Sequence, residues 1–321
     1  LDRALAQVSD KKIDAISIAG QQHGMVALDS SGEVIRDALL WNDTRSAKAA
    51  EELNAEVPDI HLRTGSKLVA SFTASKIRWL ADNEKSNLER LAAVALPHDW
   101  LSWRLSGSRD LDDLFTDRSD ASGTGYFNPV TNEYELEILK TATRGKSNPI
   151  LPKIVAPNEF GGETENGVLI AAGAGDNAGA ALGLNAKVGD LIISLGTSGT
   201  AFAVSKTPTK DPSGEIAGFA DATGNFLPLA CTLNAAKIFS SVAKLLKVDL
   251  DEFASLALRA KSGAEGLRLL PHFDGERTPN RPDIRGSFSG ITHENFTPEN
   301  LARAAIEGVI AGMVFAAQAL K

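Results

Sequence analysis

The stretch that decides the fold is residues 168–184, VLIAAGAGDNAGAALGL. Its first five residues, 168–172, predict a buried strand, because a short apolar run bounded by glycine is typical of one. The glycine-rich residues 173–177 predict a tight turn. The small residues 178–184 predict a short helix whose backbone can approach a neighbour closely. A strand, a turn and a helix in this order indicate an α/β fold.

A second pair of strands is predicted at residues 191–195 and 201–204, which are both rich in apolar residues. The change from a short helix to this hairpin predicts a domain boundary near Lys187. We therefore expect a first domain over residues 1–186 and a second over residues 187–321. A length of 321 residues also suits about two domains.

The rest of the chain contains further strands and helices. The expected elements are a strand at 13–19, a hairpin of 25–29 with 33–36, helices at 41–52, at 73–82 and from Pro97, a loop at 117–124, a surface connection at 148–165, and a helix with one buried face over 306–317. Residues 1–8 are typical of the end of a helix, and the last helix has no stop signal before Lys321. We therefore expect that the chain is cut inside two elements.

The composition excludes several classes of protein. A net charge of −8 argues against binding to nucleic acid, which needs a basic face. The single cysteine, Cys231, excludes an internal disulfide framework and a cysteine-rich zinc site. It also suits the reducing cytoplasm, where we expect the protein to act. No apolar stretch looks long enough to cross a bilayer, so we expect no membrane partner.

One glycine-rich turn has a rival interpretation as a dinucleotide site. Residues 173–178 match G-x-G-x-x-A between a strand and a helix, as that fingerprint requires. The fingerprint also needs a full crossover helix and an acid at the end of the next strand. Here the helix is short, and the nearest later acid, Asp190, precedes the next strand. An oxidoreductase is therefore the weaker alternative, and NAD binding would test it.

The turn Gly196-Thr197-Ser198-Gly199 is of a different kind, because it joins two strands. Its backbone N–H groups and hydroxyls can form a small concavity that suits a phosphate. An ordinary hairpin turn explains the same residues, and for this tetrad alone it is the better interpretation.

Two long patterns carry a family resemblance. The first is Ser71-x-Thr73-x-x-Lys76-Ile77-x-Trp79-Leu80-x-Asp82-Asn83, and the second is Gly286-x-Phe288-x-Gly290-Ile291 followed after eight residues by Asn300-Leu301-x-x-Ala304-Ala305-Ile306-Glu307. Both are complete, and with them the chain resembles the FGGY family of carbohydrate kinases. The segments that resemble its xylulose kinase branch are Gly20-Gln21-Gln22-His23-Gly24, Trp41-Asn42-Asp43-x-Arg45, Asp120-Ala121-Ser122-Gly123-Thr124, Gly175-Asp176-Asn177, Ser194-Leu195-Gly196-Thr197-Ser198-Gly199 and Gly275-Glu276-Arg277-Thr278-Pro279.

The resemblance implies two actin-like, ribonuclease-H-like ATPase domains with a cleft between them, both incomplete here. It implies a sugar on the first domain and ATP with Mg²⁺ on the second, with closure that excludes water. The implied reaction phosphorylates a ketopentose, first of all D-xylulose to D-xylulose 5-phosphate. The family's Asp-x-Gly-Thr phosphate hairpin and glycine-rich adenosine segment would lie outside residues 1–321, so we expect this chain alone to be inactive.

Asp176 is the catalytic base that the resemblance implies. A carboxylate within hydrogen-bond reach of the attacking hydroxyl can remove its proton, typically for about 10²–10⁴ in rate. Spacing alone favours a different role, the N-cap of the short helix. The match of Gly175-Asp176-Asn177 to the family reverses that preference.

Five more residues are implied as sugar ligands: Gln22, His23, Trp41, Asp43 and Asn177. Gly20 and Gly24 flank the first pair and would allow the backbone to approach a ligand. Family members often carry Met at position 22, so the amide of Gln22 leaves the sugar preference open. Trp41 would offer an apolar face to the sugar ring, whereas a helix cap or an ion pair with Arg45 explains Asp43 equally well.

The nucleotide phosphates are expected at Gly196, Thr197 and Ser198, and no residue is assigned to a metal. Asp99 and Asp120 are expected beside the site. For Lys76, Trp79 and residues 275–279, a purely structural role explains the sequence as well as a role in the site.

Several alternatives stay open within the resemblance. Ribulose, gluconate or glycerol could replace D-xylulose as the acceptor, and a truncated chain could bind sugar without turning it over. The expected partner is a small-molecule sugar. The family is often dimeric, so a homodimer is one expected assembly.

Overall fold

The computed structural model describes residues 3, 6–7, 12–279, 281 and 283–320, and it divides the chain into two compact units. The first unit holds the chain up to Ala186 together with residues 206–210 and 218–226. The second holds residues 187–205, 211–217 and 227–321. The helix end expected at residues 1–8 falls mostly outside the described residues.

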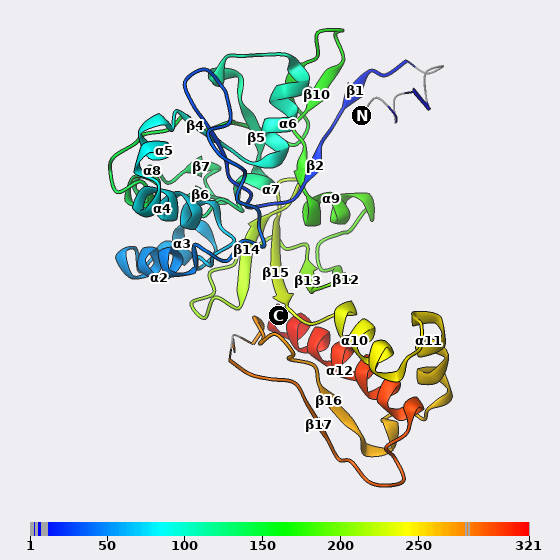
Figure 1. The fold of residues 1–321 in the computed structure, drawn as a ribbon. Helices are drawn as coiled ribbons and strands as arrows, with labels where there is room; N and C mark the ends of the chain where they lie inside the picture. The colour runs from blue at the N-terminus through cyan, green and yellow to red at the C-terminus, as the bar shows by residue number, and fades with distance from the viewer. Residues whose placement is uncertain (1–2, 4–5, 8–11, 280, 282, 321) are drawn as a thin grey trace. The chain divides into compact units, whose positions relative to one another are not determined.

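The first unit is built from short strands and eight helices among its described residues (Figure 1). Its strands are β1 (Ala15–Ile16), β2 (Ala19–Gly20), β3 (Val26–Leu28), β4 (Ala93–Ala95), β5 (Phe115–Asp117), β6 (Phe127–Asn128), β7 (Glu133–Tyr134), β8 (Lys153–Val155), β9 (Phe160–Glu163), β10 (Leu169–Ala171) and β11 (Ala174–Gly175). Its helices are α2 (Ala47–Glu56), α3 (Ile60–Thr64), α4 (Thr73–Asn83), α5 (Lys85–Arg90), α6 (Pro97–Ser106), α7 (Arg118–Ala121), α8 (Leu136–Ala142) and α9 (Asp176–Gly183), with a 3₁₀ turn at Leu111–Asp113.

Two parallel strand pairings bring distant parts of the first unit together. β1 pairs with β10, which also pairs with β9, and β2 pairs with β11 in the register Ala19↔Ala174 and Gly20↔Gly175. The expected strand at 13–19 is therefore split into two short strands, each with its own partner. Because carboxyl ends of parallel strands meet at one edge, the residues after β2 and after β11 become neighbours.

Helix α4 is the centre of a helical layer in the first unit, where it packs against α2, α5 and α8 (Figure 1). It begins at Thr73, as predicted, and Ile77 and Leu80 are fully buried on its inner face. Two charged residues of α4, Lys76 and Arg78, are also fully buried. This burial is exceptional for such side chains and needs hydrogen-bonding partners.

Three expected elements of the first unit are wrong. The polar stretch 117–124 contains the buried helix α7 instead of a loop, because the Asp117 carboxylate accepts hydrogen bonds from the N–H groups of Ser119 and Asp120 and so caps it. The stretch 148–165 contains β8 and β9. The helix expected to open at Trp41 begins only at Ala47.

The second unit carries most of a four-stranded sheet in the order β12-β13-β15-β14, in which β12 and β15 both run antiparallel to β13. Its elements are β12 (Leu191–Leu195), β13 (Gly199–Ala203), β14 (Ile216–Ala220), β15 (Phe226–Thr232), α10 (Ala236–Leu246), α11 (Leu250–Arg259), a 3₁₀ turn at Ala264–Gly266, β16 (Arg268–Leu270), β17 (Ser287–Ser289) and α12 (Pro298–Ala319). Residues 218–220 of β14 and Phe226 of β15 belong to the first unit. The predicted hairpin of β12 and β13 is present.

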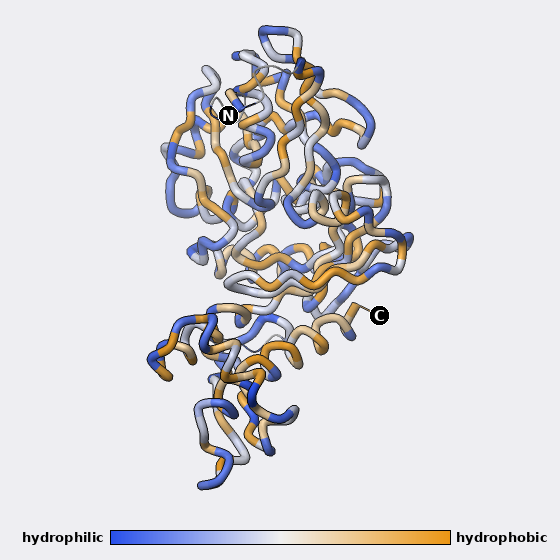
Figure 2. Tube along the Cα trace, turned by 90° about the vertical axis from the view of Figure 1, so that its right-hand side faces the viewer, coloured by the Kyte–Doolittle hydropathy of each residue, from blue (hydrophilic) through white to orange (hydrophobic). Residues whose placement is uncertain are grey.

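Helix α12 packs against α10, α11 and β16, and Leu301, Ala305 and Val309 enter the core that these elements share. Figure 2 shows its largely apolar trace running to the C label. By length and composition alone α12 would suffice to cross a membrane, so the expectation of no such stretch is wrong. Core helices pass the same test, and the buried side chains of α12 account for much of its apolar character.

Candidate active site

The pairing of β2 with β11 builds the centre of the candidate site. Gln22 and His23 follow the first of these strands, and Asp176 and Asn177 follow the second. More than 150 residues of sequence separate the two pairs, yet the register aligns Gly20 with Gly175. The strands thus bring the expected base and three expected sugar ligands to one edge of a small sheet.

Asp176 is the first residue of α9 and its side chain is exposed. The N-cap of this helix is Gly175, so Asp176 does not cap it, and the alternative role considered for this residue is not seen. The surrounding protein atoms raise the pKa of the Asp176 carboxyl, while hydrogen bonds from Asn177 oppose the rise. A carboxylate that is accessible and more basic than usual suits proton acceptance.

Asn177 holds that carboxylate in place. Its backbone N–H and its Nδ2 both donate to Oδ1 of Asp176, at 2.8 and 2.9 Å. Two donors on one oxygen limit rotation of the carboxylate and so orient it. These contacts do not test the predicted role of Asn177 as a sugar ligand, which stays a prediction.

Ser119, a buried residue of α7, connects the two strand ends. Its hydroxyl accepts from the N–H of Gly175 at 3.0 Å and donates to the Asp117 carboxylate at 2.6 Å. Its carbonyl oxygen accepts from Nε2 of Gln22 at 2.7 Å. Gln22 is itself buried, so its amide nitrogen serves this internal contact rather than standing open to solvent.

His23 is partly buried, and its ring is held on two sides. Nδ1 lies 2.6 Å from the carbonyl oxygen of Gly123, and the ring packs against Phe72 and Phe219 at centroid distances of 4.8 and 5.5 Å. A carbonyl can only accept, so Nδ1 must carry the hydrogen. In the neutral ring Nε2 is then the acceptor nitrogen, which suits a sugar hydroxyl.

The glycines that flank this segment serve packing. A Cβ on Gly20 would lie 2.8 Å from Cβ of His98, and a Cβ on Gly24 would lie 2.5 Å from Cγ of Pro97. Both contacts are with α6. We expected these glycines to admit a ligand. In the structure they instead allow the segment to pack directly against α6.

Trp41 and Asp43 lie before α2. The Trp41 side chain is half exposed, and Oδ1 of Asp43 accepts from the backbone N–H and from Nε of Arg45 at 3.0 and 2.8 Å. Burial would raise the pKa of Asp43, but the Arg45 hydrogen bonds lower it overall. The ion pair that we considered for Asp43 and Arg45 is thus present.

In the second unit, the turn of Gly196, Thr197 and Ser198 lies at the start of α10. The backbone N–H groups of Ala235 and Ala236 donate to the carbonyls of Thr197 and Gly196 at 3.3 and 2.9 Å. Gly196 and Thr197 are exposed. The turn is therefore anchored beside a helix N-terminus, where the partial positive charge favours anions.

Residues 275–279 are held by a buried carboxylate. Glu276 accepts from the N–H of Leu233 at 2.7 Å and from Nδ2 of Asn234 at 3.1 Å. These bonds tie the segment to the end of β15, which supports the structural role that we considered for it.

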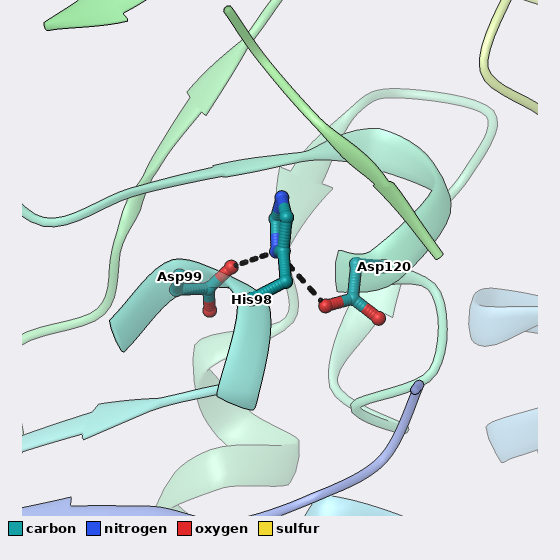
Figure 3. Close-up of side chains that lie close together, drawn as sticks. All are labelled: His98, Asp99 and Asp120. Carbon is teal, nitrogen blue, oxygen red and sulfur yellow. Dashed lines mark ion pairs between the residues drawn. The ribbon is translucent and has the colours of Figure 1, made fainter. Parts of the chain in front are cut away.

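One buried cluster joins α6 to α7 in the first unit (Figure 3). Nδ1 of His98 lies 2.7 Å from Oδ1 of Asp99 and 3.0 Å from Oδ2 of Asp120, and the two carboxylates flank the ring. Burial alone would lower the pKa of His98, but these carboxylates raise it well above its ordinary value. Burial, opposed by His98, raises the pKa of Asp120 to about 7.

This His98 cluster is, among the described residues, the one group of three or more His, Cys, Asp or Glu side chains close enough to hold a metal ion. The raised pKa of His98 favours the protonated ring, which cannot offer Nδ1 to a metal. The protonated ring between two carboxylates favours an internal ion-pair cluster.

The structure thus brings together Gln22, His23, Asp176 and Asn177, and it places Trp41 and Asp43 in an exposed turn of the same unit. It also reveals contacts of residues that sequence reasoning missed or whose role it left open. Ser119 carried no signal of its own. Lys76 and Thr73 did, because they fill defined positions of the first long pattern, and both contact His23.

Two family models match the chain along nearly its whole length. The model described as "FGGY family of carbohydrate kinases, N-terminal domain" matches residues 1–183. The model of the C-terminal domain of the same family matches residues 191–321.

Named relatives agree with this match. A xylulose kinase of Streptomyces rubiginosus is 44% identical over 313 residues, which cover 94% of this chain and 62% of that protein. The crystal structure of xylulose kinase from Bifidobacterium adolescentis is 42% identical with a TM-score of 0.84, over 96% of this chain and 70% of that one. A gluconate kinase from Lactobacillus acidophilus is 26% identical with a TM-score of 0.87, over 98% of this chain and 66% of that one. The chain thus spans less than two thirds of the length of the first relative.

Proposed function

We propose, on the premise that the chain belongs to the FGGY family of carbohydrate kinases, that the full-length protein phosphorylates D-xylulose with ATP. The chain has the two-domain actin-like ATPase fold of that family. The observation that carries the proposal is the β2–β11 pairing, which sets His23 and Asp176 at neighbouring strand ends. The naming of relatives at 44 and 42% identity as xylulose kinases supports the choice of sugar.

In the proposed mechanism, Asp176 is the general base. It accepts the proton of the sugar hydroxyl while that oxygen bonds to the γ-phosphorus of ATP, and the bond to the bridging oxygen breaks to release ADP. The two Asn177 donors keep the carboxylate oriented for this transfer. His23, with its hydrogen on Nδ1, accepts from another sugar hydroxyl through Nε2.

The turn of Gly196, Thr197 and Ser198 fits a polyphosphate, because it is exposed and anchored at the N-terminus of α10. When bound, ATP supplies the phosphoryl group and Mg²⁺ neutralises its charge. Backbone N–H groups and hydroxyls of the turn would hold the phosphates. Mg²⁺ keeps most of its waters and is usually bound through substrate phosphates with only one or two carboxylates, so we propose that the ion enters with the nucleotide.

The test is ADP release by the full-length protein with Mg²⁺ and a panel of D-xylulose, D-ribulose, D-gluconate and glycerol. We expect kcat/KM to be highest for D-xylulose. Asp176→Asn should lower kcat by about 10²–10⁴. Asp112→Asn, which changes an exposed acid in the same unit, is the matched control and should retain wild-type turnover.

The outcomes separate the parts of the proposal. Preference for another sugar would keep the kinase and overturn the substrate, and Gln22 would be the first position to vary. Retention of most turnover in Asp176→Asn would overturn the base. Absence of turnover on every sugar would overturn the kinase activity.

We further propose that the protein acts in the cytoplasm, with a small-molecule sugar as its partner, and that it forms a homodimer. The single cysteine and the need for ATP support the first point. The net charge of −8 supports the absence of a nucleic-acid partner. Cell fractionation and light scattering would test the location and the oligomeric state.

A further inference from the structure

His23 has an unusual backbone conformation for a residue with a side chain. Its φ is +71°, in the left-handed region that only glycine adopts readily. A residue keeps such a conformation only where its surroundings enforce it, and these positions concentrate at functional sites. The groups that hold the His23 backbone therefore also decide where its imidazole points.

Two side chains from the beginning of α4 hold the carbonyl oxygen of His23. Nζ of Lys76 donates to it at 2.8 Å, and Oγ1 of Thr73 donates at 3.1 Å. Lys76 Nζ also donates to the carbonyl oxygen of Ser71, just before the helix. Lys76 and Thr73 are both fully buried, so solvent does not compete for these hydrogen bonds.

Burial of Lys76 at this position costs desolvation free energy. Both of its described hydrogen bonds go to neutral backbone carbonyls. Burial lowers the pKa of its ammonium group to about 7, and the attraction of Asp43 opposes this only in part. An apolar side chain of similar length would fill the same space without the desolvation cost. This desolvation cost is explained if the hydrogen bond from Lys76 to His23 contributes to the function of the site.

We infer that Lys76, assisted by Thr73, is a positioning residue that fixes His23 for sugar binding. The His23 ring is anchored at Nδ1 by Gly123, and its backbone is anchored by α4. With both ends held, Nε2 has one defined direction. This inference rests on the proposed function, because the benefit to the protein is affinity for the sugar.

A second charged and buried residue of α4, which is not part of the long sequence pattern, provides a matched control. Arg78 is also fully buried, but it donates to the carbonyl oxygen of Thr141 at 2.5 Å and pairs with Glu56. Among the described residues, its hydrogen-bond and ion-pair partners all lie outside residues 20–24. Arg78→Met removes a buried cation from the same helix and leaves the His23 anchor intact.

The test compares wild type, Lys76→Met, Thr73→Val and Arg78→Met in the full-length protein. We expect Lys76→Met to raise KM for D-xylulose at least about tenfold, since a buried hydrogen bond that holds the His23 backbone is lost. Thr73→Val should raise it less, and KM for ATP should change less than about twofold in both. Arg78→Met should leave KM for D-xylulose at the wild-type value.

A second readout does not depend on turnover. The five histidines of this chain give few imidazole NMR signals, and the signal that disappears in His23→Gln would identify that of His23. We expect Lys76→Met and Thr73→Val to shift the His23 ring signals, and Arg78→Met to leave them in place.

The two readouts distinguish failure of this inference from failure of the proposed function. If wild type is active but neither Lys76→Met nor Thr73→Val changes KM for D-xylulose, the inference is wrong and the function stands. If wild type phosphorylates no sugar, the function fails, and unchanged His23 signals would then overturn the inference as well. If Lys76→Met does not fold, Thr73→Val decides the outcome through both readouts.

Discussion

At the scale of the residue, the candidate site depends on buried polar groups that hold its two strand ends together. Ser119 is the strongest example, because its hydroxyl joins the Gly175 N–H to the Asp117 carboxylate and its carbonyl receives Gln22. Loss of a buried hydroxyl leaves its former partners unsatisfied, which costs about 1–3 kcal/mol. It also frees the strand end that precedes Asp176.

Ser119→Ala should therefore lower the free energy of unfolding by about 1–3 kcal/mol and also lower kcat. Urea unfolding and ADP release would measure the two effects. Ser102→Ala is the control, because the Ser102 hydroxyl is buried with no hydrogen-bond partner among the described residues. Removal of that hydroxyl should leave stability unchanged or slightly higher, and equal losses in both variants would contradict the special role of Ser119.

At the scale of the element, α12 packs tightly against β16 at one glycine and has open space at another. Gly308 and Gly312 are one turn apart in this helix. A Cβ on Gly308 would lie 2.4 Å from the carbonyl oxygen of Leu269, whereas a Cβ on Gly312 would meet nothing within 4 Å. The first glycine thus permits the close packing of α12 on β16, and the second has no such reason.

Gly308→Ala should destabilise the protein by about 1–3 kcal/mol, because the β16 backbone must move. Gly312→Ala should stabilise it by about 0.5–1 kcal/mol through helix propensity alone. Thermal or urea unfolding of both variants would measure the difference. Similar effects at the two positions would mean that α12 does not pack on β16 as described.

At the scale of the whole molecule, the His98 cluster ties α6 to α7 and gives stability a dependence on pH. Asp120 has its pKa raised to about 7 by burial, against an ordinary value of 3.8. Between about pH 4 and pH 7 the folded state therefore binds more protons than the unfolded state, and stability falls as pH rises. His98, whose pKa is raised by Asp120 and Asp99 despite its burial, adds a loss in the same direction above pH 6.5.

Asp120→Asn removes the first of these titrations. From pH 4.5 to pH 7.5, the unfolding free energy of wild type should fall relative to that of this variant by a few kcal/mol, on the order of 1.4 per pKa unit. Urea unfolding at several pH values would show it. Asp112→Asn should run parallel to wild type throughout, and a parallel curve for Asp120→Asn would contradict the shifted pKa.

Several elements could be predicted because their signals are local. The periodicity of α4 and the apolar runs of β10 and β12 lie within a few residues, so they predicted these elements well. Helix α7 was missed because its residues are polar and its stability comes from an Asp117 cap and from burial. A polar composition suggests a loop unless the partners of its side chains are known.

The sequence by itself determined the family, the α/β class and the two carboxyl-end segments that carry His23 and Asp176, since each of these depends on residue order. Only the tertiary structure decided that these segments are neighbours, because strand pairing joins residues far apart in the chain. The same holds for Lys76, whose hydrogen bond to His23 exists only once α4 packs beside that strand end. Burial and hydrogen-bond partners are properties of the packed chain, so no pattern along the sequence could assign them.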